Sequence, residues 1–312
     1  MKCRFLMATL AAAVALPTLC FGAPLFTEDF SDGNAASRWS VAVQTEATAA
    51  PTTVPDGSVD FAFDYSTLGV PSAPGGTDTI GAFIQVNNTD QAGDEGESYI
   101  IYPNGQSFSG NFLLTADMYV WNDLGQSGGG TTELGMTGVF LNNADPVAPY
   151  QWGAEGGPLA WIYSGEGGST ADLAVFKEGD AASTGYVGLA DYNAVPADSI
   201  PGFETGEDAS SGPAGDNPNG SWVQVKIESV GSTINWYLNG ALVDSYDNSG
   251  GFYDAGNIFL GATDPFNSAN PAGGTIVDNI VVVPEPSSLV LMALCVVGMF
   301  TARARRGIGG TP

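Results

Sequence analysis

Apolar and polar residues alternate with a period of two over several segments of the chain. In the clearest segment, Phe112 to Val120, apolar residues occupy every second position, and Phe61 to Tyr65 repeats the pattern over a shorter length. Successive side chains of a strand point to opposite faces of a sheet, so this period predicts half-buried strands. Between the two ends of the chain, no segment of useful length has the 3.6-residue period of an amphipathic helix. The pattern therefore predicts an all-β body.

A block of consecutive antiparallel strands is predicted near the C-terminal end of this body. The segments Trp222–Glu228 and Ile234–Leu238 have strand character and are joined by Ser229–Thr233. Asn239-Gly240 follows and leads into a third strand, Ala241–Tyr246. Asn-Gly suits a type I′ turn, because both central residues of that turn need a positive φ.

The N-terminal end carries an apolar segment of targeting type. Lys2 and Arg4 precede the apolar run Leu6–Leu16, which ends at Pro17 before small residues near position 22. This order is that of a secretory signal peptide. Residues 1–22 are therefore predicted to be removed by signal peptidase during export.

A second apolar segment, Leu289–Ala302, is followed by Arg303, Arg305 and Arg306. Its fourteen residues would span about 21 Å as a helix, which is less than the roughly 30 Å of a bilayer core. A permanent membrane anchor and a buried C-terminal helix are the alternatives. A short helix that is apolar all round and basic at its end fits transient insertion, with the arginines on the cytoplasmic side.

The amino-acid composition excludes most classes of catalytic site in the body of the protein. The sequence has no His, and its three cysteines, Cys3, Cys20 and Cys295, all lie in the targeting segments. Ser/His/Asp triads, Cys nucleophiles and His-ligated metals are therefore excluded. The formal net charge of −26 excludes nucleic acid and anionic membrane surfaces as partners by repulsion. The acids fit either a solvating surface or divalent-cation binding.

Carboxylate chemistry would need paired acids on one face of a strand, as in a Glu-x-Asp-x-Glu segment. The sequence contains no such strand. The nearest acid clusters, Asp94–Glu97 and Glu204–Asp208, lie in Gly-rich sequence that predicts loops. We therefore expect no enzymatic activity, and a polysaccharide-degrading glycosidase or lyase on the same scaffold is the alternative.

Aromatic residues gather among glycines between positions 150 and 163. Trp152, with Tyr150 beside it, is the predicted exposed platform for a sugar ring, since carbohydrate recognition uses aromatic faces and a few polar groups. The alternative is that this whole group is buried. Four other aromatic residues are predicted to be core: Trp161, Tyr163, Trp222 and Trp236.

The order Val283-Pro284-Glu285-Pro286-Ser287-Ser288, an apolar segment and an Arg cluster resembles the PEP-CTERM sorting signal. The resemblance implies that an exosortase recognises this signal, that the tail is removed, and that the protein passes to the cell surface or exopolysaccharide matrix. Two prolines around a glutamate favour an extended segment, which suits a protease cleft. The residues expected to carry the signal are Pro284, Glu285, Pro286, Arg303, Arg305 and Arg306.

The block Trp222–Tyr246, with W-x-V-x-V followed by W-Y-x-N-G, resembles laminin-G-like or concanavalin A-like jelly rolls. The resemblance implies an antiparallel jelly-roll β-sandwich whose first strand, Leu25–Phe30, lies beside its last strand, Thr275–Val283. It also implies a structural calcium ion at this edge, and calcium takes hard oxygen ligands without needing His. The ligands that it implies are Glu28, Asp29 and Asp278. An acidic edge that faces water is the alternative.

These patterns together predict four parts of the chain. They are a signal peptide (1–22), one laminin-G-like sandwich (23–283), the PEP-CTERM signal (284–306) and a short tail (307–312). We expect an exported, non-catalytic protein of the cell surface or extracellular matrix, with a structural, adhesive or polysaccharide-binding task. Signal peptidase and an exosortase are its expected partners during export.

Overall fold

The computed structural model describes residues 23–45, 55–89, 96–121, 134–150, 157–164, 173–177, 186–188, 200–201, 221–264 and 273–285. These residues belong to one compact unit, Ala23–Glu285. The predicted signal peptide and the apolar C-terminal segment lie outside the described residues. Among the described helices, none has the length and apolar character needed to cross a membrane.

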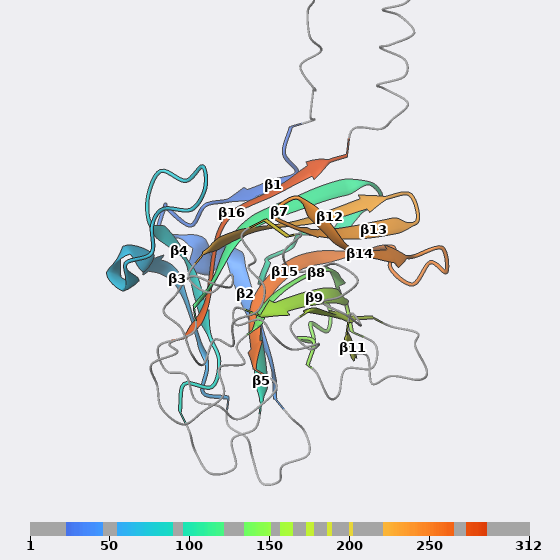
Figure 1. The fold of residues 1–312 in the computed structure, drawn as a ribbon. Helices are drawn as coiled ribbons and strands as arrows, with labels where there is room; N and C mark the ends of the chain where they lie inside the picture. The colour runs from blue at the N-terminus through green and yellow to red at the C-terminus, as the bar shows by residue number, and fades with distance from the viewer. Residues whose placement is uncertain are drawn as a thin grey trace, which may run out of the picture. The chain divides into compact units, whose positions relative to one another are not determined.

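The described strands form two antiparallel sheets of eight strands each, stacked as two layers (Figure 1). The first sheet contains, in spatial order, β14 (Ala241–Asp247), β13 (Thr233–Leu238), β12 (Trp222–Val230), β7 (Phe112–Trp121), β16 (Gly274–Pro284), β4 (Ile80–Gln85) and β3 (Ser58–Asp64), with β1 (Phe26–Glu28) beside β16. The predicted all-β sandwich is confirmed.

The second sheet contains, in spatial order, β11 (Tyr186–Gly188), β10 (Leu173–Phe176), β9 (Leu159–Ser164), β8 (Leu134–Leu141), β15 (Ala255–Asp264), β5 (Glu97–Pro103) and β2 (Trp39–Thr45), with β6 (Phe108–Ser109) beside β15. In the described part of the chain, two short helical segments connect strands, namely α1 (Ala35–Arg38) and the 3-10 helix η1 (Tyr65–Leu68).

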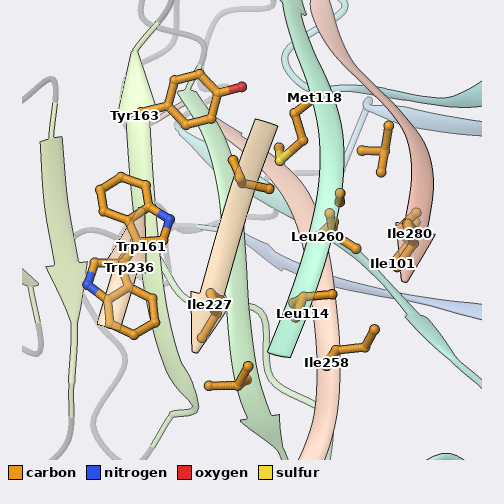
Figure 2. Packing of buried hydrophobic residues seen from close by; sticks show 14 of the residues in the cluster. Ile101, Leu114, Met118, Trp161, Tyr163, Ile227, Trp236, Ile258, Leu260 and Ile280 are labelled. Carbon is orange, nitrogen blue, oxygen red and sulfur yellow. The ribbon is translucent and has the colours of Figure 1, made fainter. Parts of the chain in front are cut away.

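The main core lies between the two sheets, and the alternating pattern of the sequence supplies it. The apolar positions of β7 that alternation predicted to be inward are at most 1% exposed: Phe112, Leu114, Ala116, Met118 and Val120. Trp161 of β9 and Trp236 of β13 stack across the layers with ring centroids 6.1 Å apart (Figure 2). Burial of such large apolar side chains is the main favourable contribution to folding.

The predicted meander of β12, β13 and β14 is confirmed, with one correction. Asn239 and Gly240 both have positive φ, at 48° and 83°, as a type I′ turn requires. The preceding loop is shorter than predicted, because Val230 pairs with Thr233 and the chain turns within two residues. The strands therefore extend into the predicted Ser229–Thr233 connection.

Two aromatic residues differ from their predicted places. Tyr65 begins η1 instead of ending a strand, because the Asp64 side chain accepts the Ser66 N–H and caps that helix. Trp222 is half-buried, whereas it was predicted to be core. Val223 takes the core-facing position of β12, so Trp222 points to the other face, where its indole N–H donates to the Pro71 carbonyl (2.8 Å).

The first and last strands of the body lie side by side, as expected. β1 pairs antiparallel with β16, with Phe26 opposite Val282 and Glu28 opposite Ile280. On its other side, the same part of β16 pairs with β7. The final strand is therefore an interior strand of the first sheet (Figure 1).

Candidate functional site

The predicted sorting signal starts inside the last strand of the sandwich. Pro284, the final residue of β16, lies opposite Phe112 of β7, and the backbone N–H of Glu285 donates to the Asn111 carbonyl (3.3 Å). The first two residues of the Pro-Glu-Pro triplet are therefore part of the folded body. The other predicted signal residues lie outside the described part of the chain: Pro286, Arg303, Arg305 and Arg306.

The Glu285 side chain is half-buried near charged residues of β12. Burial raises the pKa of Glu285, the negative charge of Glu228 raises it further, and Lys226 acts in the opposite direction. The Lys226 ammonium lies 3.5 Å from the centroid of the Tyr237 ring, and the Tyr237 hydroxyl donates to Glu228 (2.8 Å). The glutamate of the signal thus lies beside a small charged and aromatic network on the sheet surface.

Glu28, the first of the expected calcium ligands, is buried and saturated with hydrogen bonds. Its carboxylate accepts bonds from the Arg38 guanidinium, the Trp39 indole N–H and the Phe30 backbone N–H, at 2.8–3.0 Å. The Glu28 side chain is 4% exposed, against 38% for Arg38. The charge of Glu28 is therefore compensated by an arginine that the sequence analysis did not assign to this edge.

The other two expected ligands have separate surroundings. Asp29 is exposed and accepts bonds from the backbone N–H and hydroxyl of Ser31. Asp278 is 2% exposed and accepts bonds from the Tyr65 hydroxyl (3.0 Å) and the Asn279 backbone N–H (2.7 Å). In the described ranges, no three His, Cys, Asp or Glu residues form a group that could hold a metal ion. The three expected ligands are thus not brought into one set, and calcium binding stays a prediction.

A hollow of about 490 Å³ lies at the edge formed by β1, α1 and β16, and most of the residues that line it are polar, with Ile280 and Val281 beside them. Its wall offers hydrogen-bond donors and acceptors together, an arrangement that suits a ligand rich in hydroxyl groups. Arg38 forms an ion pair with Asp32 at 2.8 Å within this wall. The polar residues that line the hollow are Thr27, Glu28, Asp29, Ser31, Asp32, Arg38 and Asn279.

Two buried carboxyl groups lie opposite each other across β7 and β16. Asp117 and Asp278 are direct partners in the register and are 3% and 2% exposed. Burial raises the pKa of Asp278 to about 7 and raises that of Asp117 as well. Asn279 has a positive φ of 50° and donates its side-chain N–H to Asp117 (2.9 Å). The signal for this pair in the sequence is a single Asp within each of two mostly apolar strand segments.

A second buried acid pair corrects the prediction made for Glu97. Glu97 was expected in a loop, but it begins β5, where it is 1% exposed and lies opposite Asp264, which is 0% exposed. Asn87 donates its backbone N–H to Glu97 (2.7 Å) and its side-chain N–H to Asp264 (2.8 Å). Burial raises the pKa of Glu97 to about 7. Glu97 belongs to the strand because β5 pairs with both neighbours from its first residue. Asp94 and Glu95, together with the cluster Glu204–Asp208, lie outside the described residues.

The predicted aromatic platform is corrected in part. Tyr150 is 2% exposed, so its ring is packed inside the body instead of facing solvent. Trp152 lies outside the described residues. Trp161 and Tyr163 are fully buried, as predicted, and the Trp161 indole N–H donates to Asp244 (2.6 Å).

Comparison with known proteins assigns the C-terminal end. Residues 282–306 match the PEP-CTERM protein-sorting motif. No curated protein matches the chain. The motif implies export, sorting to the cell surface and processing by an exosortase.

Solved structures resemble the body at low sequence identity. A protein of unknown function with a galectin-like fold from Bacillus subtilis is 12% identical, covers 85% of this chain and 97% of its own, and has a TM-score of 0.46. The carbohydrate-binding module CBM66 from Bacillus subtilis is 14% identical, covers 66% and 89%, and has a TM-score of 0.37.

A beta-1,3-glucanase from Mycobacterium marinum is 10% identical, covers 84% of this chain and 99% of its own, and has a TM-score of 0.40. These low values support no activity in preference to another. What the matches and the geometry show is an antiparallel β-sandwich whose last strand leads directly into a PEP-CTERM sorting motif.

Proposed function

We propose that this protein is an exported, non-catalytic component of the cell surface or extracellular matrix, delivered by an exosortase, whose sandwich holds polysaccharide. The observation that carries the proposal is the continuity of β16 with the sorting motif, which begins at Val282. A signal joined to the sandwich without a linker makes the folded body itself the cargo that is displayed.

The acids of the body support a role without catalysis. Glycoside cleavage needs two carboxyl groups that reach the same substrate bond. The buried pairs Asp117–Asp278 and Glu97–Asp264 are both closed off from solvent, and Glu28 is compensated by Arg38. With no His in the sequence, other acid/base groups of suitable pKa are scarce.

The charge of the chain and the polar hollow together suggest the class of polysaccharide. A formal net charge of −26 repels anionic chains, so a neutral or cationic polysaccharide is the expected ligand. The hollow beside β1 supplies the exposed carboxylates of Asp29 and Asp32 and the hydroxyl groups of Thr27 and Ser31 for contacts with sugar hydroxyls. Asp29 is the best single probe, because it is exposed there and, among the described residues, its side chain accepts hydrogen bonds only from the nearby Ser31.

The test incubates exported protein with neutral, cationic and anionic polysaccharides and records both protein depletion and new reducing ends. We expect depletion by a neutral or cationic polymer, no new reducing ends, and binding about tenfold weaker for Asp29→Asn, as loss of a charged hydrogen bond would give. Asp60→Asn, on the exposed side of β3, is the matched control for charge. New reducing ends would contradict the non-catalytic role. If none of the polymers depletes the protein from solution, polysaccharide is not its ligand.

A further inference from the structure

The sorting motif overlaps a strand that is hydrogen-bonded on both edges. Val282, the first residue of the motif, lies opposite Phe26 of β1 on one side and Leu114 of β7 on the other. Its side chain is fully buried, and its carbonyl accepts the Leu25 N–H at 2.7 Å. The start of the motif therefore contributes to the core of the sandwich.

The pairing continues into the Pro-Glu-Pro triplet. Proline has no N–H, so Pro284 cannot donate to the ladder, and the next donor is the N–H of Glu285. This N–H donates to the Asn111 carbonyl. The Asn111 side chain in turn accepts the Gly231 N–H of the β12–β13 turn (3.0 Å). The acceptor of Glu285 is thus fixed in place by a neighbouring hairpin.

The end of the strand is held weakly compared with its interior. The bond from Glu285 to Asn111 is long at 3.3 Å, and the half-buried Glu285 carboxylate lies near the like charge of Glu228. Strand ends with few buried contacts open locally at a small cost in free energy. Release of Pro284 and Glu285 would break that bond and one pair of the ladder while leaving Val282 buried.

Peptide-processing enzymes commonly hold an extended substrate by pairing with its backbone edges. Both edges of β16 are paired at Val282, and at Pro284 and Glu285 the edge that faces β7 is still occupied. These two residues therefore cannot offer that edge to a cleft while they lie on the sheet. We infer that the folded sandwich keeps Pro284 and Glu285 closed to the sorting enzyme, and that the tail is removed only after these residues leave β7. The inference rests on the exosortase processing proposed above.

A cross-link that holds the end of β16 on the sheet tests whether the folded strand blocks the sorting enzyme. Val283 and Leu113 are opposite each other and half-buried, and opposed residues of antiparallel strands have the spacing that a disulfide needs. The body has no cysteine of its own, so Leu113→Cys with Val283→Cys gives one new pair. The control carries Ser40→Cys and Tyr102→Cys, which are half-buried and opposed between β2 and β5 in the second sheet, away from the motif.

Full-length variants are followed by pulse-chase in cells that contain the exosortase, with loss of the tail read by mass and cross-linking read by thiol labelling. We expect the Leu113/Val283 cross-link to slow tail removal at least about tenfold, because cleavage depends on the opened population. Reductant should restore the rate, and the Ser40/Tyr102 control should match the wild type. Processing of the cross-linked chain at the wild-type rate would overturn the inference and leave exosortase sorting intact.

A second variant releases the motif without any cross-link. A Gly-Ser-Gly insertion between Val283 and Pro284 moves the triplet off β7, and the same insertion between Gly250 and Gly251, in an exposed turn, is its control. If the folded strand blocks the sorting enzyme, only the first insertion should speed up removal of the tail. Equal rates for both insertions and the wild type would count against it. A wild-type chain that keeps its tail would instead refute the sorting proposal itself.

Discussion

Glu28 is a carboxylate that folding removes from water and gives a complete set of donors. A buried charge is tolerated when it is paired and hydrogen-bonded, and Arg38, Trp39 and the Phe30 N–H fulfil that condition. The contacts connect β1 to α1 and to the start of β2. Glu28 therefore has a structural role at the edge where the first strand joins the sheet.

Glu28→Gln removes the charge but keeps the shape, and we expect the free energy of unfolding to fall by about 1–3 kcal/mol, because a neutral amide cannot accept all the hydrogen bonds that the buried carboxylate accepts. Urea denaturation measures the change. Asp32→Asn, which removes the exposed partner of the same arginine, is the control and should barely change the midpoint. Equal midpoints for the two variants would show that Glu28 has no special structural role.

At the residue scale, the sequence predicted burial well where strand period decided it, as for Trp161 and Trp236. The prediction of burial was wrong for Trp222, because the next residue, Val223, occupies the core-facing position of the strand. It also failed for Tyr150, because burial there comes from tertiary packing and not from a local period. The Glu28–Arg38 pair joins different elements, so residue type alone gave no sign of it.

The register of β7 and β16 brings Asp117 and Asp278 together. Asp278 has a pKa near 7 in the folded chain, against an ordinary value of 3.8. A group whose pKa is higher in the folded state binds its proton more tightly there, so stability falls as pH rises through this window. Glu97, also with a pKa near 7, acts in the same direction. We therefore expect the sandwich to be more stable at pH 5 than at pH 8.

Asp278→Asn tests that expectation, because it replaces the buried carboxyl with a neutral amide. At pH 8 the variant should have a free energy of unfolding higher by about 1–3 kcal/mol than the wild type, and the difference should shrink towards pH 5. Thermal melts across this range provide the measurement, with Asp60→Asn as the control for loss of an exposed charge. A wild type that gains stability as pH rises from 5 to 8 would refute the assignment.

At the element scale, β7, the β12–β14 meander and the β1–β16 neighbours were all predictable from alternation, turn chemistry and family resemblance. The Asn-Gly pair was informative because few residues adopt its positive φ values at low cost. The start of β5 was not predictable, since Glu97 follows Gly-rich acidic sequence and becomes a strand residue only through pairing with both β2 and β15. Long-range pairing of this kind leaves no local pattern.

At the scale of the whole molecule, two signals in the sequence describe different things. The alternating body specifies a folded sandwich, and the terminal motif specifies where that sandwich is sent. The structure adds that the two overlap by a few residues at the end of β16. Neither signal identifies the ligand, because sugar contacts depend on loops and hollows that the strand pattern does not encode.

We propose that removal of the C-terminal tail delivers the protein to the cell surface. Intact mass measurement of protein recovered from the surface of native cells tests it most directly, compared with cells that lack the exosortase. We expect the surface form to lack Arg303 to Arg306, and the form from exosortase-deficient cells to keep them and to be lost from the surface. Surface protein that retains these arginines in cells with an active exosortase would refute delivery by removal of the tail.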